Sequence, residues 1–208
     1  MKIGSGVTVL FQGDSITDSN RNRNRLADLG DGYVMMVAER FFARHNEANV
    51  SFVNRGISGN RIKDMRERWQ EDCLSLKPDI VSILIGVNDS LGTFLWEEPA
   101  FIEIFEEDFI SILNLTRKYL DAHIVLMEPF LLPLSKEQTI LRKDLCERIK
   151  VIRKLAKEYE TELIQLDSVF FEAAKSKPSR FWTTDGVHPT PAGHALIADA
   201  WLSKIDFT

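Results

Sequence analysis

The chain has 208 residues, of which 44% are hydrophobic and 27% charged, and its formal net charge at pH 7 is -5. This length and composition predict one globular domain over residues 1–208. The negative net charge argues against a nucleic-acid partner, because phosphate binding requires clustered Lys and Arg. No apolar run reaches the roughly 18 residues that a membrane-spanning helix needs, so no membrane partner is expected either.

One short run of basic residues stands out from this acidic background. Arginine alternates with other residues at Arg21, Arg23 and Arg25, and acidic side chains flank the run at Asp18, Asp28 and Asp31. Mixed charges of this kind are typical of a solvated loop. We therefore expect the run to lie on the surface.

The amino terminus and the cysteines favour a cytoplasmic protein. The apolar segment Val7–Phe11 leads directly into Gly13-Asp14-Ser15, so a cleavable signal peptide would consume the strand that carries this motif. Cys73 and Cys146 are expected to be free thiols in a reducing compartment. Neither has metal-ligand spacing, so neither a metal nor another cofactor is predicted. The oligomeric state stays open, a homo-oligomer included.

Short β-rich segments alternate with longer amphipathic ones along the chain. The short segments are rich in Val, Ile, Leu and Phe, with little polar alternation, as in strands buried on both faces of a parallel sheet. The predicted strands are Val7–Phe11, Val50–Val53, Ile80–Ile85, Ile124–Met127 and Leu163–Leu166.

The longer segments carry apolar residues at helical spacing. They predict helices around residues 33–42, 62–73, 101–116 and 141–159, and a closing helix after Pro191. Regular alternation of strand and helix predicts an α/β fold with a parallel sheet covered by helices on both faces. Ligand chemistry is then expected at the carboxyl ends of the strands.

Four polar clusters fall where such a site would form. Three of them follow the first three strands, and the fourth lies before the last helix. They are Gly13-Asp14-Ser15-Ile16-Thr17, Asn54–Asn60, Gly86-Val87-Asn88-Asp89 and Asp185-Gly186-Val187-His188-Pro189. Because the first three emerge at one edge of a parallel sheet, residues far apart in sequence can meet there.

These clusters contain the groups that nucleophilic catalysis requires. A serine hydroxyl such as that of Ser15 needs a base to take its proton, and His188 suits this role. Asp185, three residues earlier, is placed to accept a hydrogen bond from the imidazole. The backbone N–H groups of Ser15 and Gly59 and the side-chain amide of Asn88 are candidates for an oxyanion hole. Asp14 is expected to brace the loop by hydrogen bonding to the backbone.

In order and spacing, these four clusters resemble the sequence blocks of the SGNH (GDSL-like) hydrolases. The resemblance implies a three-layer α/β/α sandwich of the flavodoxin-like type, with a five-stranded parallel sheet in the order 2-1-3-4-5. It also implies that Ser15 is the nucleophile, His188 the base and Asp185 its orienting partner. Ser15, Gly59 and Asn88 would form the oxyanion hole.

A closer likeness covers nearly the whole chain and points to the intracellular acetylxylan esterases. Its residues are Met1–Gly6, Gly13–Asp18, Asn54–Asn60, Arg68–Asp72, Lys77–Asp79 and His188–His194. The resemblance implies removal of acetyl groups from xylo-oligosaccharides. The segments 21–29 and 89–99 do not match confidently, and both are expected at the mouth of the pocket.

Two tryptophans are candidates for substrate stacking, and two are not. Trp69 and Trp201 fall on apolar helix stripes and are expected in the core, whereas Trp96 and Trp182 lie in the chain near Asn88 and Asp185. Two other functions remain open. One is a lysophospholipase or acyl-thioesterase with an apolar groove that includes Leu91, Phe94, Leu95 and Trp96. The other is a non-catalytic ligand-binding module.

Overall fold

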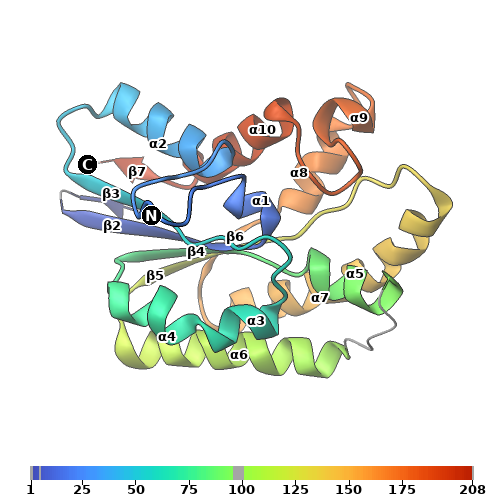
Figure 1. The fold of residues 1–208 in the computed structure, drawn as a ribbon, viewed down its shortest axis with the longest axis horizontal. Coiled ribbons are helices and arrows are strands. Elements are labelled where there is room, and N and C mark those ends of the chain that lie inside the picture. The colour runs from blue at the N-terminus through green and yellow to red at the C-terminus, as the bar shows by residue number, and fades with distance from the viewer. Residues whose placement is uncertain (1, 5, 96–100, 208) are drawn as a thin grey trace.

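A five-stranded parallel sheet forms the centre of the molecule (Figure 1). The computed structural model describes residues 2–4, 6–95 and 101–207. The strands lie in the order β3-β2-β4-β5-β6, which is 2-1-3-4-5 when these five are counted along the chain, so the predicted topology is confirmed. Their bounds are β2 (Val7–Gly13), β3 (Val50–Asn54), β4 (Ile80–Leu84), β5 (His123–Met127) and β6 (Glu162–Ile164).

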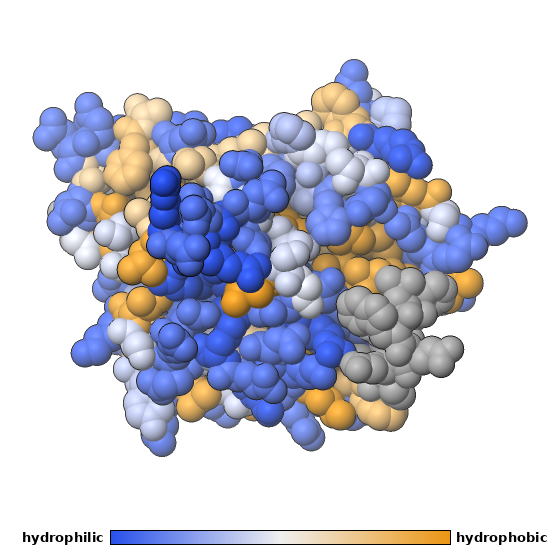
Figure 2. Space-filling view, in the orientation of Figure 1, coloured by the Kyte–Doolittle hydropathy of each residue, from blue (hydrophilic) through white to orange (hydrophobic). Residues whose placement is uncertain are grey.

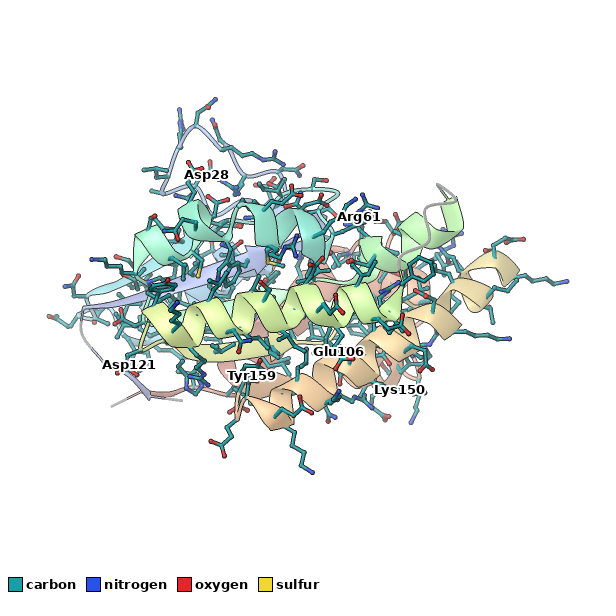
Figure 3. The ribbon with its side chains drawn as sticks, turned by 90° about the horizontal axis from the view of Figure 1, so that it is seen from below. Asp28, Arg61, Glu106, Asp121, Lys150 and Tyr159 are labelled. Carbon is teal, nitrogen blue, oxygen red and sulfur yellow. The ribbon has the colours of Figure 1, made fainter. Side chains whose placement is uncertain are left out.

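Helices cover both faces of this sheet (Figure 1). One layer contains α2 (Tyr33–Arg44), α8 (Leu166–Ala173), α9 (Ser179–Trp182) and α10 (Pro191–Leu202). The other contains α3 (Ile62–Glu67), α4 (Trp69–Asp72), α6 (Ile102–Tyr119) and α7 (Lys136–Glu158). Figure 3 looks onto this second layer, with α6 and α7 lying across it.

Apolar side chains pack on both faces of the sheet, as the uninterrupted apolar strands predict. On one face Phe11 contacts Tyr33 and Trp201, with ring centroids 5.7 and 5.1 Å apart. On the other face Trp69 is fully buried, and its indole N–H donates to Thr116 Oγ1 at 3.1 Å. Trp69 and Trp201 are therefore core residues, as expected. Hydrophilic residues cover most of the face drawn in Figure 2.

Two short strands lie outside the main sheet. β1 (Lys2–Ile3) and β7 (Asp206–Phe207) pair in parallel and bring the two ends of the described chain together. Neither was predicted, because two-residue strands leave no periodic pattern. Within the described residues, none of the helices has the length and apolar character needed to cross a membrane.

The helix predicted over 62–73 is interrupted. It is divided at Arg68 into α3 and α4, and a 3-10 turn, Leu74–Leu76, follows. The guanidinium of Arg68 points into the molecule, where it donates to Gln12 Oε1 at 2.8 Å and to the carbonyl oxygen of Arg55 at 2.9 Å. The break coincides with this inward arginine, which ties the helix to the ends of β2 and β3.

The segment after Asn88, for which no helix was predicted, is helical. α5 (Val87–Leu95) begins one residue after Gly86, and Asp89 Oδ1 accepts the N–H of Ile62 at 3.2 Å. Leu91 packs against the hydrophobic core. The segment was misread because polar and small residues interrupt its apolar stripe, although tertiary contacts fix it as a helix.

Candidate active site

Ser15 follows the end of β2, an interior strand of the sheet, and is the first residue of α1 (Ser15–Asp18). Asp14 caps this short helix, and its Oδ1 accepts the N–H of Ile16 at 3.0 Å, as predicted for a bracing residue. The turn requires glycine at 13, because a Cβ there would lie 2.3 Å from Thr17 Oγ1 and 2.5 Å from the carbonyl oxygen of Leu84. The nucleophile candidate is thus held by backbone geometry at the sheet edge.

Asp185 and His188 lie on the loop between α9 and α10. The loop closes on itself, since the N–H of Thr184 donates to the carbonyl oxygen of His188 at 2.8 Å. It is also tied to the chain before α7, where the N–H of Leu132 donates to the carbonyl oxygen of Gly186 at 2.9 Å. Gly186 has φ +96°, a conformation that favours glycine.

The fold joins the three predicted side chains in one hydrogen-bonded chain. Ser15 Oγ lies 3.0 Å from His188 Nε2, and His188 Nδ1 lies 2.7 Å from Asp185 Oδ2. Asp185 Oδ1 accepts the backbone N–H groups of Val187 and His188 at 2.9 and 2.7 Å. This order of contacts lets Nε2 accept the serine proton while the carboxylate fixes the Nδ1–H tautomer.

Electrostatics keep Asp185 ionised in this arrangement. Burial acts to raise the pKa of Asp185, but the hydrogen bonds from the His188 ring and from the two backbone N–H groups outweigh it, so its pKa lies below the usual value. Asp14 behaves oppositely. Burial raises the pKa of Asp14 to about 7, although its hydrogen bond with Ile16 and the nearby charge of His188 act to lower it.

Gly59 and Asn88 are the other candidates for oxyanion donors. Asn88, in the first turn of α5, uses one amide hydrogen to donate to the carbonyl oxygen of Asn60 at 3.0 Å, which leaves its second hydrogen for a ligand. Gly59 has φ +83°, and a Cβ there would meet nothing within 4 Å. The positive φ favours glycine at 59, and no protein atom fills the space where a side chain would lie.

A cavity of about 600 Å³ opens beside Ser15 and His188. Its walls are largely polar and come mainly from α1, the segment after it and the start of α10. The lining residues are Ser15, Ile16, Asp18, Ser19, Asn20, Arg21, Arg23, Ser58, His188, Pro189 and His194. Gly59 and Asn88 are not among them.

Of the two tryptophans predicted to stack on substrate, Trp182 does not line this cavity. Trp182 packs against the core, and its indole N–H donates to the carbonyl oxygen of Ala173 at 3.1 Å. Its place in the sequence near Asp185 is therefore explained by packing. Trp96 lies outside the described residues.

Arg21 and His194 line the cavity although neither was predicted to be functional. Arg21 was expected on the surface but is only 8% exposed, whereas Arg23 and Arg25 are exposed. Sequence spacing could not show which of these three arginines is buried, because the direction of each side chain depends on how the loop folds back. His194 was expected to be structural, and its Nδ1 does accept the N–H of Tyr33 at 3.1 Å, but it also lines the cavity.

Comparison with known proteins agrees with this geometry. The profile of the GDSL-like lipase/acylhydrolase family matches residues 11–196. An acetylxylan esterase from Geobacillus stearothermophilus is 37% identical over 215 residues, which cover 100% of this chain and 97% of that protein. A crystal structure of Axe2, an acetylxylan esterase from the same species, has a TM-score of 0.89 and 36% identity, covering 98% of this chain and 95% of that one.

Further structures support the same relationship. A protein from Parabacteroides merdae, whose name places it with the GDSL-like lipases, has a TM-score of 0.92 and 38% identity, covering 97% of this chain and 96% of that one. Three Axe2 structures are named as catalytic mutants, in which a serine, an aspartate or a histidine is replaced by alanine. Together, these matches over nearly the full chain show that this protein belongs to the GDSL-like lipase/acylhydrolase (SGNH) family and is a carboxylic ester hydrolase.

Proposed function

We propose that Ser15, His188 and Asp185 form the catalytic triad of an esterase that removes acetyl groups from carbohydrates, and in particular from acetylated xylo-oligosaccharides. The observation that carries the proposal is the hydrogen-bonded chain from Ser15 Oγ through the His188 ring to Asp185, placed beside a polar cavity. The family and the similarity to acetylxylan esterases support the same chemistry.

In the first half of the reaction, Ser15 Oγ attacks the ester carbonyl while His188 Nε2 accepts its proton. The oxyanion of the tetrahedral intermediate accepts hydrogen bonds from the N–H groups of Ser15 and Gly59 and from Asn88 Nδ2. The intermediate collapses to an acyl-enzyme as His188 returns the proton to the leaving alcohol. In the second half, water attacks the acyl-enzyme while His188 Nε2 accepts its proton. The acid then leaves as His188 returns this proton to Ser15 Oγ.

The polar cavity favours a sugar over a long acyl chain. A lipid-cleaving enzyme needs an apolar groove, in which each buried CH2 adds about 0.8 kcal/mol of binding. The described walls instead carry hydroxyl, amide, imidazole and guanidinium groups. Leu91, which we considered as part of such a groove, packs against the core. A lysophospholipase or thioesterase is therefore the weaker alternative, and a binding module would need no serine–histidine pair.

Mass spectrometry of acetylated xylo-oligosaccharides before and after incubation tests the substrate. We expect a loss of acetyl groups with wild type and none with Ser15→Ala, which removes the attacking oxygen. A p-nitrophenyl ester series should show kcat/KM falling steeply beyond about four acyl carbons, because a pocket sized for acetyl excludes longer chains. Rates that rise from acetate to octanoate, with the oligosaccharides untouched, would reassign the enzyme to lipid or thioester substrates.

The thiols support a cytoplasmic location as part of this proposal. Cys73 is buried and Cys146 half-buried, and both are free. Free thiols persist in reducing compartments. Fractionation of the source cells should place the esterase with cytoplasmic markers; recovery with secreted proteins would contradict this location.

A further inference from the structure

Arg21 places a buried guanidinium on the wall of the active-site cavity. Its side chain is only 4% exposed, and its Nε donates to the carbonyl oxygen of Gly56 at 3.0 Å. Both Ser15 and His188 line the same cavity. A charged side chain is rarely buried at this level without a partner for its charge, so the surroundings of Arg21 are informative.

The nearest carboxylate is largely engaged by other groups. Asp18 Oδ2 accepts from Arg23 Nη2 at 2.5 Å and from the N–H of Ser58 at 2.9 Å. Arg21 Nε lies 3.8 Å from the other oxygen, Asp18 Oδ1, which is too far for a hydrogen bond. Among the described residues, no side chain or carbonyl group accepts a hydrogen bond from Nη1 or Nη2 of Arg21. Two guanidinium groups thus share one carboxylate, and four N–H donors remain for a ligand.

The backbone before Arg21 adopts an uncommon conformation that turns the chain back toward Ser15. Ser19 and Asn20 have φ of 39° and 61°, in the left-handed region that residues other than glycine seldom occupy. The turn is held by the N–H of Arg21, which donates to the carbonyl oxygen of Asp18 at 3.0 Å. Such conformations persist where the surrounding structure enforces them, and they cluster at ligand sites.

The position of the cavity indicates which half of an ester it receives. The leaving oxygen must lie near His188 Nε2, because this atom returns the proton to it. Ser15 and His188 both line the cavity, but the oxyanion donors Gly59 and Asn88 do not. The alcohol part of the substrate, rather than the acyl oxygen, is therefore the part that reaches Arg21.

We propose that Arg21 binds a carboxylate on the alcohol part of the substrate, so that the preferred esters are acetylated sugar acids (uronates). This inference rests on the proposed sugar-esterase function and narrows its substrate class. A guanidinium presents paired N–H groups that match the two oxygens of a carboxylate, and it stays charged when buried. The nearby Asn20 and Ser58 offer neutral donors and acceptors for the sugar hydroxyls.

A matched pair of substrates tests the inference: the methyl glycosides of 3-O-acetylglucose and 3-O-acetylglucuronic acid, which differ only at C6. For wild type we expect kcat/KM at low salt to be about tenfold higher for the uronate, mainly through KM. Arg21→Gln should bring this ratio close to one. Arg25→Gln is the control, since Arg25 lies in the same segment but is exposed and outside the cavity, and it should keep the wild-type ratio.

Each outcome decides a separate question. Equal rates on the two sugars in wild type, or a uronate preference that survives in Arg21→Gln, overturns the assignment to Arg21 while the esterase function stands. Hydrolysis of acetylated xylo-oligosaccharides with neither monosaccharide cleaved overturns this inference alone. Hydrolysis of p-nitrophenyl acetate with none of these sugars cleaved refutes the proposed function, and this inference with it. If Arg21→Gln does not fold, two measurements on wild type still test the inference. The uronate should be cleaved with the higher kcat/KM, and methyl glucuronide should be a stronger competitive inhibitor than methyl glucoside.

Discussion

At the scale of single residues, ionisation of Asp14 should make the activity of Ser15 and His188 depend on pH. Burial raises the pKa of Asp14 to about 7, and its charge interacts with His188. Above this pH an ionised Asp14 stabilises the imidazolium that forms when His188 accepts the serine proton. We expect Asp14→Asn, which keeps an acceptor for the Ile16 N–H, to lower kcat/KM at pH 8 by roughly three- to tenfold, or about 1 kcal/mol of barrier, and to change it little at pH 5.

Stability should respond in the opposite direction. Between pH 4 and 7 the native state binds more protons at Asp14 than the unfolded state, so this carboxyl makes stability fall as pH rises through that window. Asparagine does not titrate, so Asp14→Asn should not lose stability in this way. We expect its free energy of unfolding at pH 8, measured in urea, to exceed that of wild type. Wild-type kcat/KM in Asp14→Asn at both pH 5 and pH 8 would show that Asp14 acts only as a helix cap.

Asn88 provides a test of the oxyanion hole. One of its amide hydrogens is committed to Asn60, which fixes the direction of the other. Asn88→Ala should lower kcat by roughly a hundredfold to a thousandfold, the usual loss for one oxyanion donor. KM should change much less, because the hydrogen bond strengthens as negative charge develops. Steady-state kinetics with p-nitrophenyl acetate separate the two; a change confined to KM would make Asn88 a substrate-binding residue.

The residues of the site differ in how far sequence could place them. Ser15 could be placed at the sheet edge because it follows a strand of the parallel sheet. Asp185 and His188 lie on the loop between α9 and α10, and they were assigned from their chemistry, their spacing and the family resemblance. Arg21 and Trp182 could not be placed in this way. Whether such side chains face a cavity or the core depends on how a loop folds back, as at Ser19 and Asn20, and on packing partners such as Ala173.

At the scale of secondary-structure elements, the first turn of α7 holds the loop that carries Asp185. Gln138 Nε2 donates to the carbonyl oxygen of Asp185 at 2.6 Å, while its Oε1 accepts the N–H of Leu134 at 2.7 Å. Gln138 is thus a positioning residue that acts through the loop. We expect Gln138→Glu to lower kcat about tenfold, because the carboxylate still accepts from Leu134 but repels the Asp185 carbonyl.

A neighbouring side chain provides the matched control for Gln138. Glu137 lies one residue earlier in the same turn and is exposed, so Glu137→Gln should leave kcat unchanged. Gln138→Glu should keep KM near the wild-type value, since the loop is displaced without loss of a cavity residue. If Gln138→Glu is folded by circular dichroism and has the wild-type kcat, then Gln138 does not position the loop that carries Asp185.

The elements themselves were predicted best where their pattern is long and apolar. α6, α7 and the five strands of the main sheet were found within a few residues of their bounds, because burial sets a clear period there. α5 was missed and the segment 62–73 was not seen to be broken. In both places a polar contact decides the structure: Asp89 with the N–H of Ile62, and Arg68 with Gln12 and Arg55.

At the scale of the whole molecule, His194 joins the two helices that cover one face of the sheet. It lies near the start of α10, and its Nδ1 accepts the N–H of Tyr33 at the start of α2. Burial lowers the pKa of His194 to about 4, with a further contribution from His188. The neutral ring is therefore part of the native packing between α10 and α2.

Acid should weaken the fold through this histidine. Between pH 6.5 and 4 the unfolded chain binds a proton at His194 that the native state excludes, so stability falls as pH decreases through this window. The slope is at most about 1.4 kcal/mol per pH unit, and it is smaller here because the ring is partly exposed. Asp14 acts with the opposite sign over an overlapping range, and the net pH dependence reflects both groups.

His194→Asn isolates this contribution, because asparagine keeps an acceptor near the Nδ1 position but does not titrate. We expect the variant to lose less unfolding free energy than wild type between pH 7 and pH 5 in urea titrations monitored by tryptophan fluorescence. His45→Asn is the control, since His45 follows the carboxyl end of α2 and lies outside the cavity. If His194→Asn and wild type lose equal stability over this interval, the acid sensitivity of the fold does not arise from burial of His194, and its ring is charged in the native state well above pH 4.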